Sequence, residues 1–469
     1  MNNKVLKNMI YNFTGNMVTK VISFLVVAVT ARVFGSAIFG EYNIALTEYS
    51  YFLMISVFGT SGYGLYLLAK ENDHQEQQRI ISEISTVKMI MGVIASIAVF
   101  IYVLLPSTHN CVWPYFLLLL FQSCEISWIF QALQDMRITA FASMIITPVN
   151  AILLILFFLL GVRNVYTLIF PNIISTLSLY LVYVVYLRKK YGLSISVKKV
   201  NIIKFLKNSF PYMASGIFAG INTNIDILIM GYVQDNSMVG YYSADYKIVN
   251  EFISICSIIF TPLFPMFVEK IANGDIKNLN SIIGKLRTVL MSFIIPCAII
   301  GVIFGRNLLS LLYGREYENG YVAFAILLIY VVLLYYREIY GYALSAAGKQ
   351  SLYLRIVSLS GMCNVILNLI FIPYYGIVAA AATTLLSELI NLFGMKYYTE
   401  KNINLQIENY NLNKLIFLCV FTFGIAVLLK FSGIYYIFSI VIIGIGYIFL
   451  YCLAGVIDPD LINRLLKNN

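Results

Sequence analysis

Residues 9–30, with the sequence MIYNFTGNMVTKVISFLVVAVT, form an apolar run that carries one charged side chain, Lys20. About 20 mostly apolar residues are enough for a helix to cross the hydrocarbon core of a bilayer. The run follows Lys4 and Lys7, as in a secretory signal peptide, but it is longer than the ~7–15 apolar residues of such a signal. We therefore expect residues 9–30 to be a first membrane-spanning helix.

Further runs of this kind continue along the whole chain. The chain is 60% hydrophobic and 12% charged, about half the charged fraction of a soluble domain. We predict an all-α membrane protein with about 14 transmembrane helices, the later ones at residues 43–69, 86–105, 113–133, 142–160, 165–187, 210–231, 248–268, 288–312, 321–346, 356–372, 376–397, 413–430 and 433–455.

Lys and Arg are distributed unequally between the two sides of this predicted topology. If the N-terminus is inside, the inner segments carry twenty-four basic residues, Lys88 among them, and the outer segments carry six. Basic residues are enriched in cytoplasmic connections, so both termini are expected to be cytoplasmic. The net charge of +10 then marks topology and attraction to anionic membrane lipids, and no nucleic acid is expected as a partner.

Short motifs recur at a constant distance in the two halves of the chain. Leu6-Lys7-Asn8 returns as Leu206-Lys207-Asn208, and Ile38-Phe39-Gly40-Glu41-Tyr42 returns as Met238-Val239-Gly240-Tyr241-Tyr242, both 200 residues later. Six helices per copy keep both copies in one orientation, so the repeat is predicted to be parallel.

The repeat divides the chain into parts. We expect two parallel six-helix lobes around a central cavity and two extra C-terminal helices. The predicted parts are an N-terminal lobe (1–187), a cytoplasmic linker (188–208), a C-terminal lobe (209–397), a cytoplasmic loop (398–412), the extra helix pair (413–455) and a cytoplasmic tail (456–469).

Ionisable residues inside the predicted spans indicate function, because each costs about 2.5–3.5 kcal/mol at the bilayer centre. The cations are Lys20, on one polar stripe with Asn16, and Arg337. The acids are Glu48, Glu125, Asp226, Glu251, Glu338 and Glu388. Ion pairs that only hold helices together are the alternative reading for each acid.

Some of these acids lie beside other oxygen donors. Asp226 shares its helix with Asn222, Asn364 and Asn368 lie on one face of a later helix, and Thr384 and Glu388 lie on one face of the next. Buried carboxylates bind and release protons near neutral pH, and they also coordinate Na⁺. Either H⁺ or Na⁺ coupling is therefore open, and no cofactor or other metal is expected.

Five stretches resemble one transporter family. They are Leu6-Lys7-Asn8, Arg32-Val-Phe-Gly35, Phe39-Gly40-Glu41-Tyr42, Trp128-Ile-Phe-Gln-Ala-Leu-Gln-Asp-Met136 and Pro373-Tyr-Tyr-Gly-Ile-Val-Ala-Ala-Ala381. Over roughly residues 5–400 the chain resembles the polysaccharide-transporter branch (Wzx-type O-antigen and capsule repeat-unit flippases) of the multidrug/oligosaccharidyl-lipid/polysaccharide exporter superfamily. The set Asp226, Asn364, Asn368, Thr384 and Glu388 resembles the sodium site of the lipid II flippase, with Asn368 where an acid is expected.

The resemblance implies a flippase that moves undecaprenyl-diphosphate-linked oligosaccharide repeat units to the outer face of the bacterial inner membrane by alternating access. Lys20 and Arg337 would contact the diphosphate with Asn16, and Arg32 and Arg355 would act where the cargo enters or leaves. A polysaccharide polymerase and chain-length machinery are possible protein partners. Lipid II flippase and multidrug/cation antiporter are the alternatives.

An enzyme is disfavoured by the connections between the predicted spans. The outer connections are all short, and the chain contains no nucleophile elbow or phosphate-binding glycine loop; its one Asp-x-Asp sequence, Asp458-Pro-Asp460, lies in the predicted tail. A membrane glycosyltransferase or polymerase tends to need a sizeable loop outside the membrane to hold its catalytic groups. We therefore predict a transporter.

Overall fold

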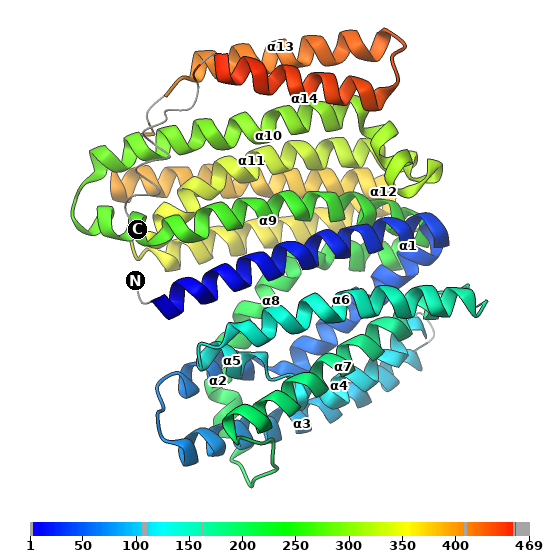
Figure 1. Ribbon diagram of the computed structural model, residues 1–469, viewed down its shortest axis with the longest axis vertical. Helices are drawn as coiled ribbons and strands as arrows, with labels where there is room; N and C mark the ends of the chain where they lie inside the picture. The colour runs from blue at the N-terminus through cyan, green and yellow to red at the C-terminus, as the bar shows by residue number, and fades with distance from the viewer. Residues whose placement is uncertain (1–2, 106–109, 162, 408–409, 454, 456–469) are drawn as a thin grey trace. The chain divides into compact units, whose positions relative to one another are not determined.

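The computed structural model describes the backbone of residues 3–105, 110–161, 163–407, 410–453 and 455. Within these ranges it describes all side chains except those of residues 3–18, 215, 218–219, 221–223 and 262. Every regular element in the described ranges is a helix, as Figure 1 shows. The predicted all-α fold is confirmed.

Ten of the described helices are long and apolar enough to cross a membrane. The number rises to eleven if the bent pair Asn236–Thr261 and Leu263–Ala272 counts as one span. The chain is therefore a multi-pass membrane protein, whereas the exact number of fourteen spans stays a prediction.

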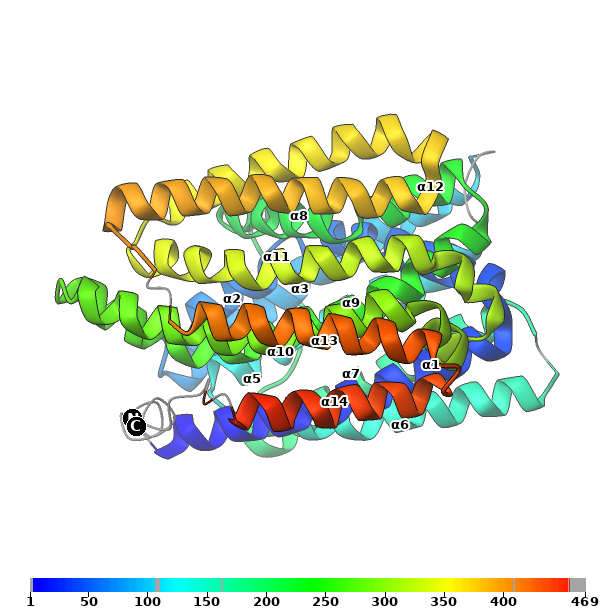
Figure 2. The same cartoon turned by 90° about the horizontal axis from the view of Figure 1, so that it is seen from above.

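Two of the helices are folded back on themselves at a single glycine. α1 (Asn3–Val57) contains Gly35 at φ 78°, ψ 169°, and α12 (Gln350–Ile403) contains Gly376 at φ 55°, ψ −135°. Only glycine adopts such conformations without strain. Figures 1 and 2 show α1 and α12 reversing direction, so each supplies two antiparallel limbs.

The chain divides into two compact units, Met1–Gly240 and Tyr241–Asn469. The first unit contains α1, α2 (Thr60–Leu68), α3 (His74–Val103), η1 (Asn110–Tyr115), α4 (Phe116–Leu120), η2 (Phe121–Cys124), α5 (Ser127–Ala132), α6 (Met136–Leu159), α7 (Tyr166–Tyr191) and α8 (Ile202–Val233). Its apolar clusters join these helices, for example through Tyr49 of α1, stacked on Tyr115 of η1 at 4.6 Å between ring centroids.

Two predicted spans of the first unit are broken in the structure. The predicted helix 43–69 is interrupted at Phe58 and Gly59, which both have positive φ (43° and 70°). The predicted helix 113–133 consists of short 3₁₀ and α segments. Both runs are apolar enough to span a membrane. An apolar composition indicates that a segment lies in lipid, but it does not show whether the segment is one continuous helix.

α3 begins earlier in the sequence than the predicted span 86–105. It begins at His74, capped by Asp73, whose side chain accepts a hydrogen bond from the Glu76 amide, and not near residue 86. Lys88, assigned to an inner connection, is therefore a buried residue of the helix. The first turns of α3 are polar, so the apolar run in the sequence does not include them.

The polar chain between α7 and α8 lies along α3. The Lys198 amide donates to Thr86 Oγ1 at 3.0 Å, and the Ser82 and Ser196 hydroxyls are 2.7 Å apart. α8 begins at Ile202, so Lys204 and Lys207, which the sequence places in the linker, belong to its first turns.

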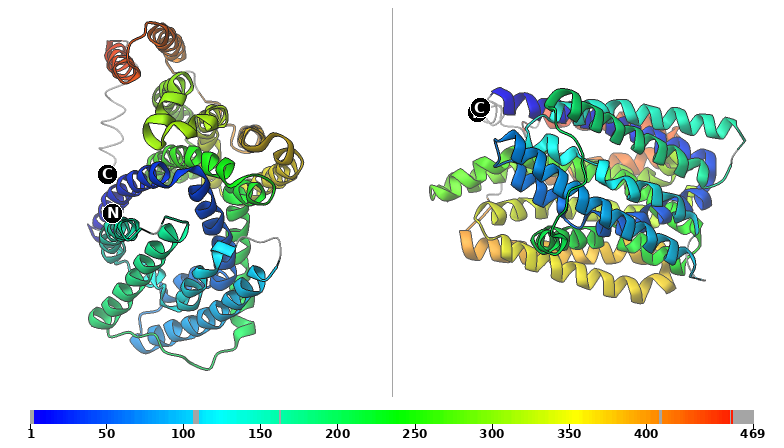
Figure 3. Two further views of the ribbon diagram at one scale, coloured as in Figure 1. Left: turned by 90° about the vertical axis from the view of Figure 1, so that its right-hand side faces the viewer. Right: turned by 90° about the horizontal axis from the view of Figure 1, so that it is seen from below.

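The second unit contains most of α9 (Asn236–Ala272), then α10 (Ile276–Tyr313), η3 (Arg315–Gly320), α11 (Tyr321–Ala346), α12, α13 (Leu412–Phe431) and α14 (Tyr436–Leu453). Figure 3 (left) looks nearly along the helix axes of each unit. The C-terminal helix pair packs on α10, where the Tyr447 hydroxyl donates to the Ser292 carbonyl at 2.6 Å.

The first turn of α9 belongs to the first unit and touches the second limb of α1 through two glycines. A Cβ atom on Gly40 would lie 1.8 Å from the Asn236 carbonyl oxygen, and one on Gly240 would lie 2.1 Å from the Ser36 carbonyl oxygen. Residues 36 and 236, like residues 40 and 240, are 200 positions apart in the sequence. The predicted repeat motif therefore contacts its own second copy reciprocally.

Candidate functional site

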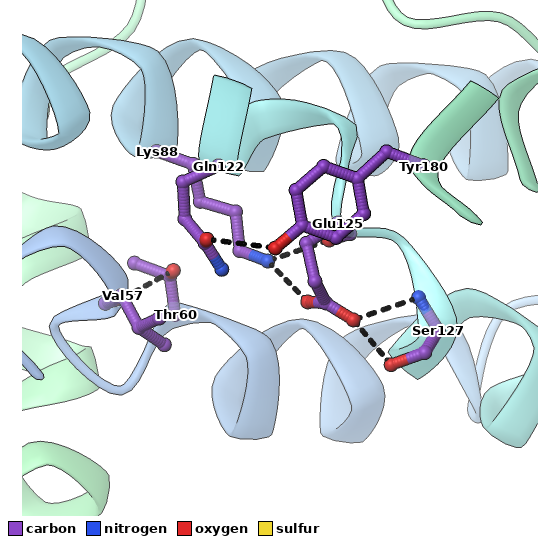
Figure 4. Close-up of polar contacts among 7 residues, drawn as sticks. All are labelled: Val57, Thr60, Lys88, Gln122, Glu125, Ser127 and Tyr180. Atoms are coloured by element: carbon purple, nitrogen blue, oxygen red, sulfur yellow. Dashed lines mark hydrogen bonds and ion pairs between the residues drawn. The ribbon is translucent and has the colours of Figure 1, made fainter. Parts of the chain in front are cut away.

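The first unit buries an ion pair between α3 and the broken segment that follows η2. Lys88 Nζ lies 3.1 Å from Glu125 Oε2 and donates to the Glu125 carbonyl oxygen at 2.8 Å, as Figure 4 shows. The Lys88 side chain is 1% exposed and the Glu125 side chain 22% exposed. One buried positive charge is therefore matched by one carboxylate.

The break in the helix creates this site. Glu125 is extended (φ −76°, ψ 97°) between η2 and α5, which frees its carbonyl for Lys88. Glu125 Oε1 accepts from the Ser127 amide at 3.2 Å and from the Ser127 hydroxyl. Beside the pair, the Tyr180 hydroxyl donates to Gln122 Oε1 (Figure 4). The Glu125 carbonyl that the break leaves open is thus satisfied by the Lys88 side chain, as a backbone group out of reach of water requires.

The second unit buries a cluster of one guanidinium and two carboxylates. Arg337 Nε donates to Glu388 Oε1 at 2.7 Å, and Arg337 Nη1 donates to Glu338 Oε1 at 2.9 Å. The side chains of Arg337 and Glu388 are 10% and 4% exposed. The Asn391 amide donates to Glu388 Oε2 at 3.3 Å. With all three groups ionised, the cluster carries one surplus negative charge.

A polar seam joins the two limbs of α12. The Asn368 amide donates to Asn364 Oδ1 at 3.0 Å, and the Thr383 hydroxyl donates to Asn368 Oδ1. The predicted ligand Thr384 donates instead to the Ala380 carbonyl of its own helix at 2.9 Å. The seam therefore brings Asn364 and Asn368 together with Thr383, while Glu388 bonds to Arg337.

Two further predicted acids lie in the first unit. Glu48 is buried in α1 and accepts a hydrogen bond from the Tyr102 hydroxyl at 2.6 Å; the Tyr232 hydroxyl is close to that of Tyr102. Asp226 is buried in α8 and accepts from the Ile227 amide at 3.2 Å. In the second unit, Glu251 is half-buried in α9.

The remaining predicted cargo contacts differ in exposure. Lys20 is half-buried in α1, whereas Arg32 of α1 and Arg355 of α12 are exposed. Asn16 lies outside the side chains that the structure describes.

An acidic residue outside the spans joins the ends of α5, α6 and α7. Asp135 Oδ2 accepts from Lys190 Nζ at 2.5 Å, from the Tyr191 hydroxyl at 2.8 Å and from the Tyr186 hydroxyl at 3.0 Å. Burial alone would raise the pKa of Asp135, but these three hydrogen bonds outweigh it and lower the pKa. The aspartate is therefore ionised at neutral pH.

Sequence reasoning missed several buried charged residues, among them Lys88 and Asp245. Both lie in helices that begin about a dozen residues before the apolar run, since α3 starts at His74 and α9 at Asn236. The capping residue Asp73 was the available signal for α3.

The fold and its buried charges define a multi-pass membrane protein with polar clusters inside each unit. The family model described as "Polysaccharide biosynthesis protein" matches residues 5–270. The chain belongs to this family, which confirms the resemblance seen in its motifs.

Relatives and solved structures agree with this assignment. The chain is 24% identical over 407 residues to the capsular polysaccharide biosynthesis protein CapF of Staphylococcus aureus, covering 85% of this chain and 100% of the relative. It is 21% identical over 360 residues to a putative O-antigen transporter of Shigella dysenteriae, covering 73% and 88%.

Two solved structures share the fold. The lipid II flippase MurJ in an inward closed conformation has a TM-score of 0.74 at 14% identity, covering 95% of this chain and 98% of that one. An inward-facing multidrug resistance transporter of the MATE family has a TM-score of 0.64 at 12% identity, covering 81% and 95%.

Proposed function

We propose that the protein is a flippase that moves undecaprenyl-diphosphate-linked oligosaccharide repeat units, of O-antigen or capsule, from the cytoplasmic to the outer face of the bacterial inner membrane. Its family and the names of its relatives support polysaccharide export. The orientation, with both termini cytoplasmic, is part of the proposal and rests on the distribution of Lys and Arg.

The observation that carries the proposal is the buried Arg337, held by two carboxylates. A guanidinium presents a planar fork of donors that suits carboxylate and phosphate oxygens alike. A diphosphate can therefore replace Glu338 and Glu388 on Arg337 and keep the guanidinium paired, while the displaced carboxylates take up protons or water. Exchange of one anion for another lowers the cost of moving a doubly charged head group through the membrane.

The other cations would extend this path. Lys20 lies in the first limb of α1 with Asn16, and we assign both to the wall of the central cavity in the proposed parallel arrangement of lobes. The exposed Arg32 and Arg355 are proposed to meet the head group where it enters or leaves. Coupling to H⁺ or Na⁺ is proposed to involve the acids of the spans, with Asp226, Asn364, Asn368, Thr384 and Glu388 as candidates.

The test is translocation of a defined cargo by the purified protein in liposomes. Undecaprenyl-diphosphate-linked oligosaccharide is loaded in both leaflets, and a membrane-impermeant glycosidase outside reports the fraction that becomes accessible. We expect wild-type protein to expose the inner pool, Arg337→Lys to expose it more slowly, and Arg337→Gln/Glu388→Gln to expose none while remaining folded.

Other cargoes in the same assay decide between the alternatives. Exposure of lipid II but not of the oligosaccharide repeat unit would replace the proposed cargo by peptidoglycan precursor. Efflux of a cationic drug that persists in the Arg337→Gln/Glu388→Gln variant would favour a drug antiporter. In cells, deletion of the gene is expected to leave lipid-linked repeat units on the cytoplasmic face, where the polymerase cannot reach them.

A further inference from the structure

Asp245 of α9 is a buried acid that neither charge cluster uses. The residue is 1% exposed, and neither Oδ1 nor Oδ2 has a hydrogen-bond partner among the described residues. It differs in this from Glu125, Glu338 and Glu388, which are all bonded to a cation.

The carboxyl group of Asp245 packs directly on the backbone where η3 passes into α11. A Cβ atom on Gly320 would lie 2.7 Å from Asp245 Oδ2 and 3.3 Å from Oδ1. The helix start offers no amide in exchange, because η3 continues into α11 and the Tyr321 amide already donates to the Glu318 carbonyl. The contact is therefore apolar although a helix begins beside it.

The buried titratable groups around Asp245 are tyrosines. The Tyr313 hydroxyl of α10 donates to the Ala244 carbonyl at 3.2 Å, and the Tyr317 ring of η3 lies 5.4 Å from that of Tyr313. α9 itself adds Tyr241, Tyr242 and Tyr246, all buried. These neighbours are neutral at physiological pH.

The described charged residues of the adjoining elements form no hydrogen bond with the Asp245 carboxyl group. On η3, Arg315 and Glu316 are exposed and Glu318 is half-buried, and on α9, Lys247 and Glu251 are half-buried. Within the described residues, none of them forms an ion pair or hydrogen bond with Asp245. A carboxylate anion in this position would have neither a counter-charge nor a donor, and such groups become neutral instead.

We propose that Asp245 is a proton-binding site, with its carboxyl group protonated in this conformation and deprotonated when α9 and η3 separate enough to admit water. A proton fits better than Na⁺, which needs several oxygen ligands, because the Tyr313 hydroxyl is already directed at Ala244 and Gly320 brings carbon against the carboxyl group. The proton site stands without any assumption about cargo. Its use in driving transport rests on the proposed function.

Dicyclohexylcarbodiimide tests the protonation state directly. The protonated carboxyl group adds across one C=N bond of the reagent, with the carboxyl oxygen bonding to carbon and the proton moving to nitrogen. The acyl group then shifts to nitrogen, which gives a stable N-acylurea without loss of atoms. Peptide mass spectrometry of the purified full-length protein measures the product at each acid.

We expect labelling of Asp245 at pH 7 to exceed that of Glu388 by at least about tenfold, because Glu388 is paired with Arg337 and Asp245 has no hydrogen-bond donor beside it among the described residues. Labelling of Asp245 should fall as the pH is raised, and replacing KCl by NaCl should not change it. Asp245→Asn, which keeps the shape of a protonated aspartate, should remain folded and lose only this product.

Two outcomes would overturn the inference. Absence of labelling at Asp245 between pH 5 and 7, in protein that is labelled at another acid, would show that the carboxyl group is ionised or unreachable. Protection by NaCl at constant ionic strength would identify Asp245 as a sodium ligand instead of a proton site.

The coupling role is tested separately in the liposome assay with an imposed pH gradient. We expect the gradient to accelerate translocation by wild-type protein and to leave the Asp245→Asn rate unchanged. A variant that still responds fully to the gradient would exclude Asp245 from coupling. If neither protein moves the oligosaccharide lipid, the proposed function fails, while the labelling result still decides the proton site.

Discussion

The two units bury charge in different ways. In the first unit, Lys88 is matched by a single carboxylate and also fills a backbone carbonyl left open by a broken helix. In the second, Arg337 lies on a continuous helix, α11, and holds two carboxylates. The first cluster is neutral, whereas the second carries a surplus negative charge when all its groups are ionised.

The chemistry of the two cations explains the difference. A lysine ammonium is a compact charge with three donors that can be directed independently, so it can serve a side chain and a carbonyl together. The arginine fork addresses two acceptor groups side by side. The Lys88 pair therefore stabilises a break in the backbone, while Arg337 joins a carboxylate of its own helix to a carboxylate of α12.

The largest effect is expected from removing the cation of the second cluster. Arg337→Ala leaves Glu388 buried without a cation, beside the partly exposed Glu338, which should lower the free energy of unfolding by about 5 kcal/mol. Unfolding in mixed micelles with increasing SDS, followed by circular dichroism, measures the loss. The triple variant Arg337→Ala/Glu338→Gln/Glu388→Gln should recover most of it, and if it does not, packing and not charge is responsible.

A smaller loss is expected in the first unit. Lys88→Met should destabilise the protein by about 3 kcal/mol, at the lower end for a broken buried pair, because Glu125 is partly exposed and can be hydrated. Lys88→Met/Glu125→Gln is the matched control and should restore much of the stability. Equal losses for Lys88→Met and Arg337→Ala would remove the distinction between the clusters.

Hydrogen bonds to the two acids sharpen the comparison further. Ser127→Ala removes a hydroxyl that donates to the charged Glu125, which should cost about 1.5 kcal/mol. Asn391→Ala removes a longer bond of 3.3 Å to Glu388, which should cost only about 0.6 kcal/mol. The same SDS titration compares the two, and the reverse order would show that the Asn391 bond to Glu388 stabilises the protein more than the Ser127 bonds to Glu125.

The smallest effect concerns Asp135, at the end of the first unit's broken span. Its lowered pKa means that its hydrogen bonds stabilise the protein above the pKa of an unfolded aspartate, and that this contribution is lost as the pH falls through the lower pKa of the folded state. Asp135→Asn should therefore cost about 1 kcal/mol or less at pH 7. Thermal unfolding from pH 7 to pH 3 should show the difference from wild type shrinking, and a difference that is constant with pH would exclude this charge effect.

Hydrophobicity was sufficient to predict the all-α membrane fold, because lipid leaves almost no other way to satisfy the backbone. It placed the two reversals correctly, between the spans 9–30 and 43–69 and between the spans 356–372 and 376–397, but it did not show that a single glycine, Gly35 or Gly376, turns the chain at each. It also missed the polar first turns of α3 and α9. Helices continue past the hydrocarbon region wherever capping residues and side-chain hydrogen bonds stabilise them. The hydropathy of the sequence indicates neither kind of interaction.

The candidate site was predictable in its residues and not in its pairings. Arg337, Glu338 and Glu388 were all recognised as costly at bilayer depth, but Glu388 is 51 residues from Arg337 in the sequence, so only the packing of α11 on α12 brings them together. Lys88 and Asp245 were overlooked for the opposite reason, because each was counted as part of a connection. A charged residue in a connection is expected to be in water, where it has no desolvation cost and so does not indicate a functional site.

The reciprocal glycine contact between α1 and α9 has a consequence for how the sequence can change over time. Each glycine faces a carbonyl oxygen of the other motif copy, so the contact depends on backbone and not on the side chains at positions 36 and 236. Those positions hold different residues, Ser36 and Asn236, whereas both contacts are made by a glycine. In a dimer of identical subunits on a twofold axis, one substitution changes both sides of the interface. In a single chain that carries two copies of a motif, a substitution changes only one side of the contact.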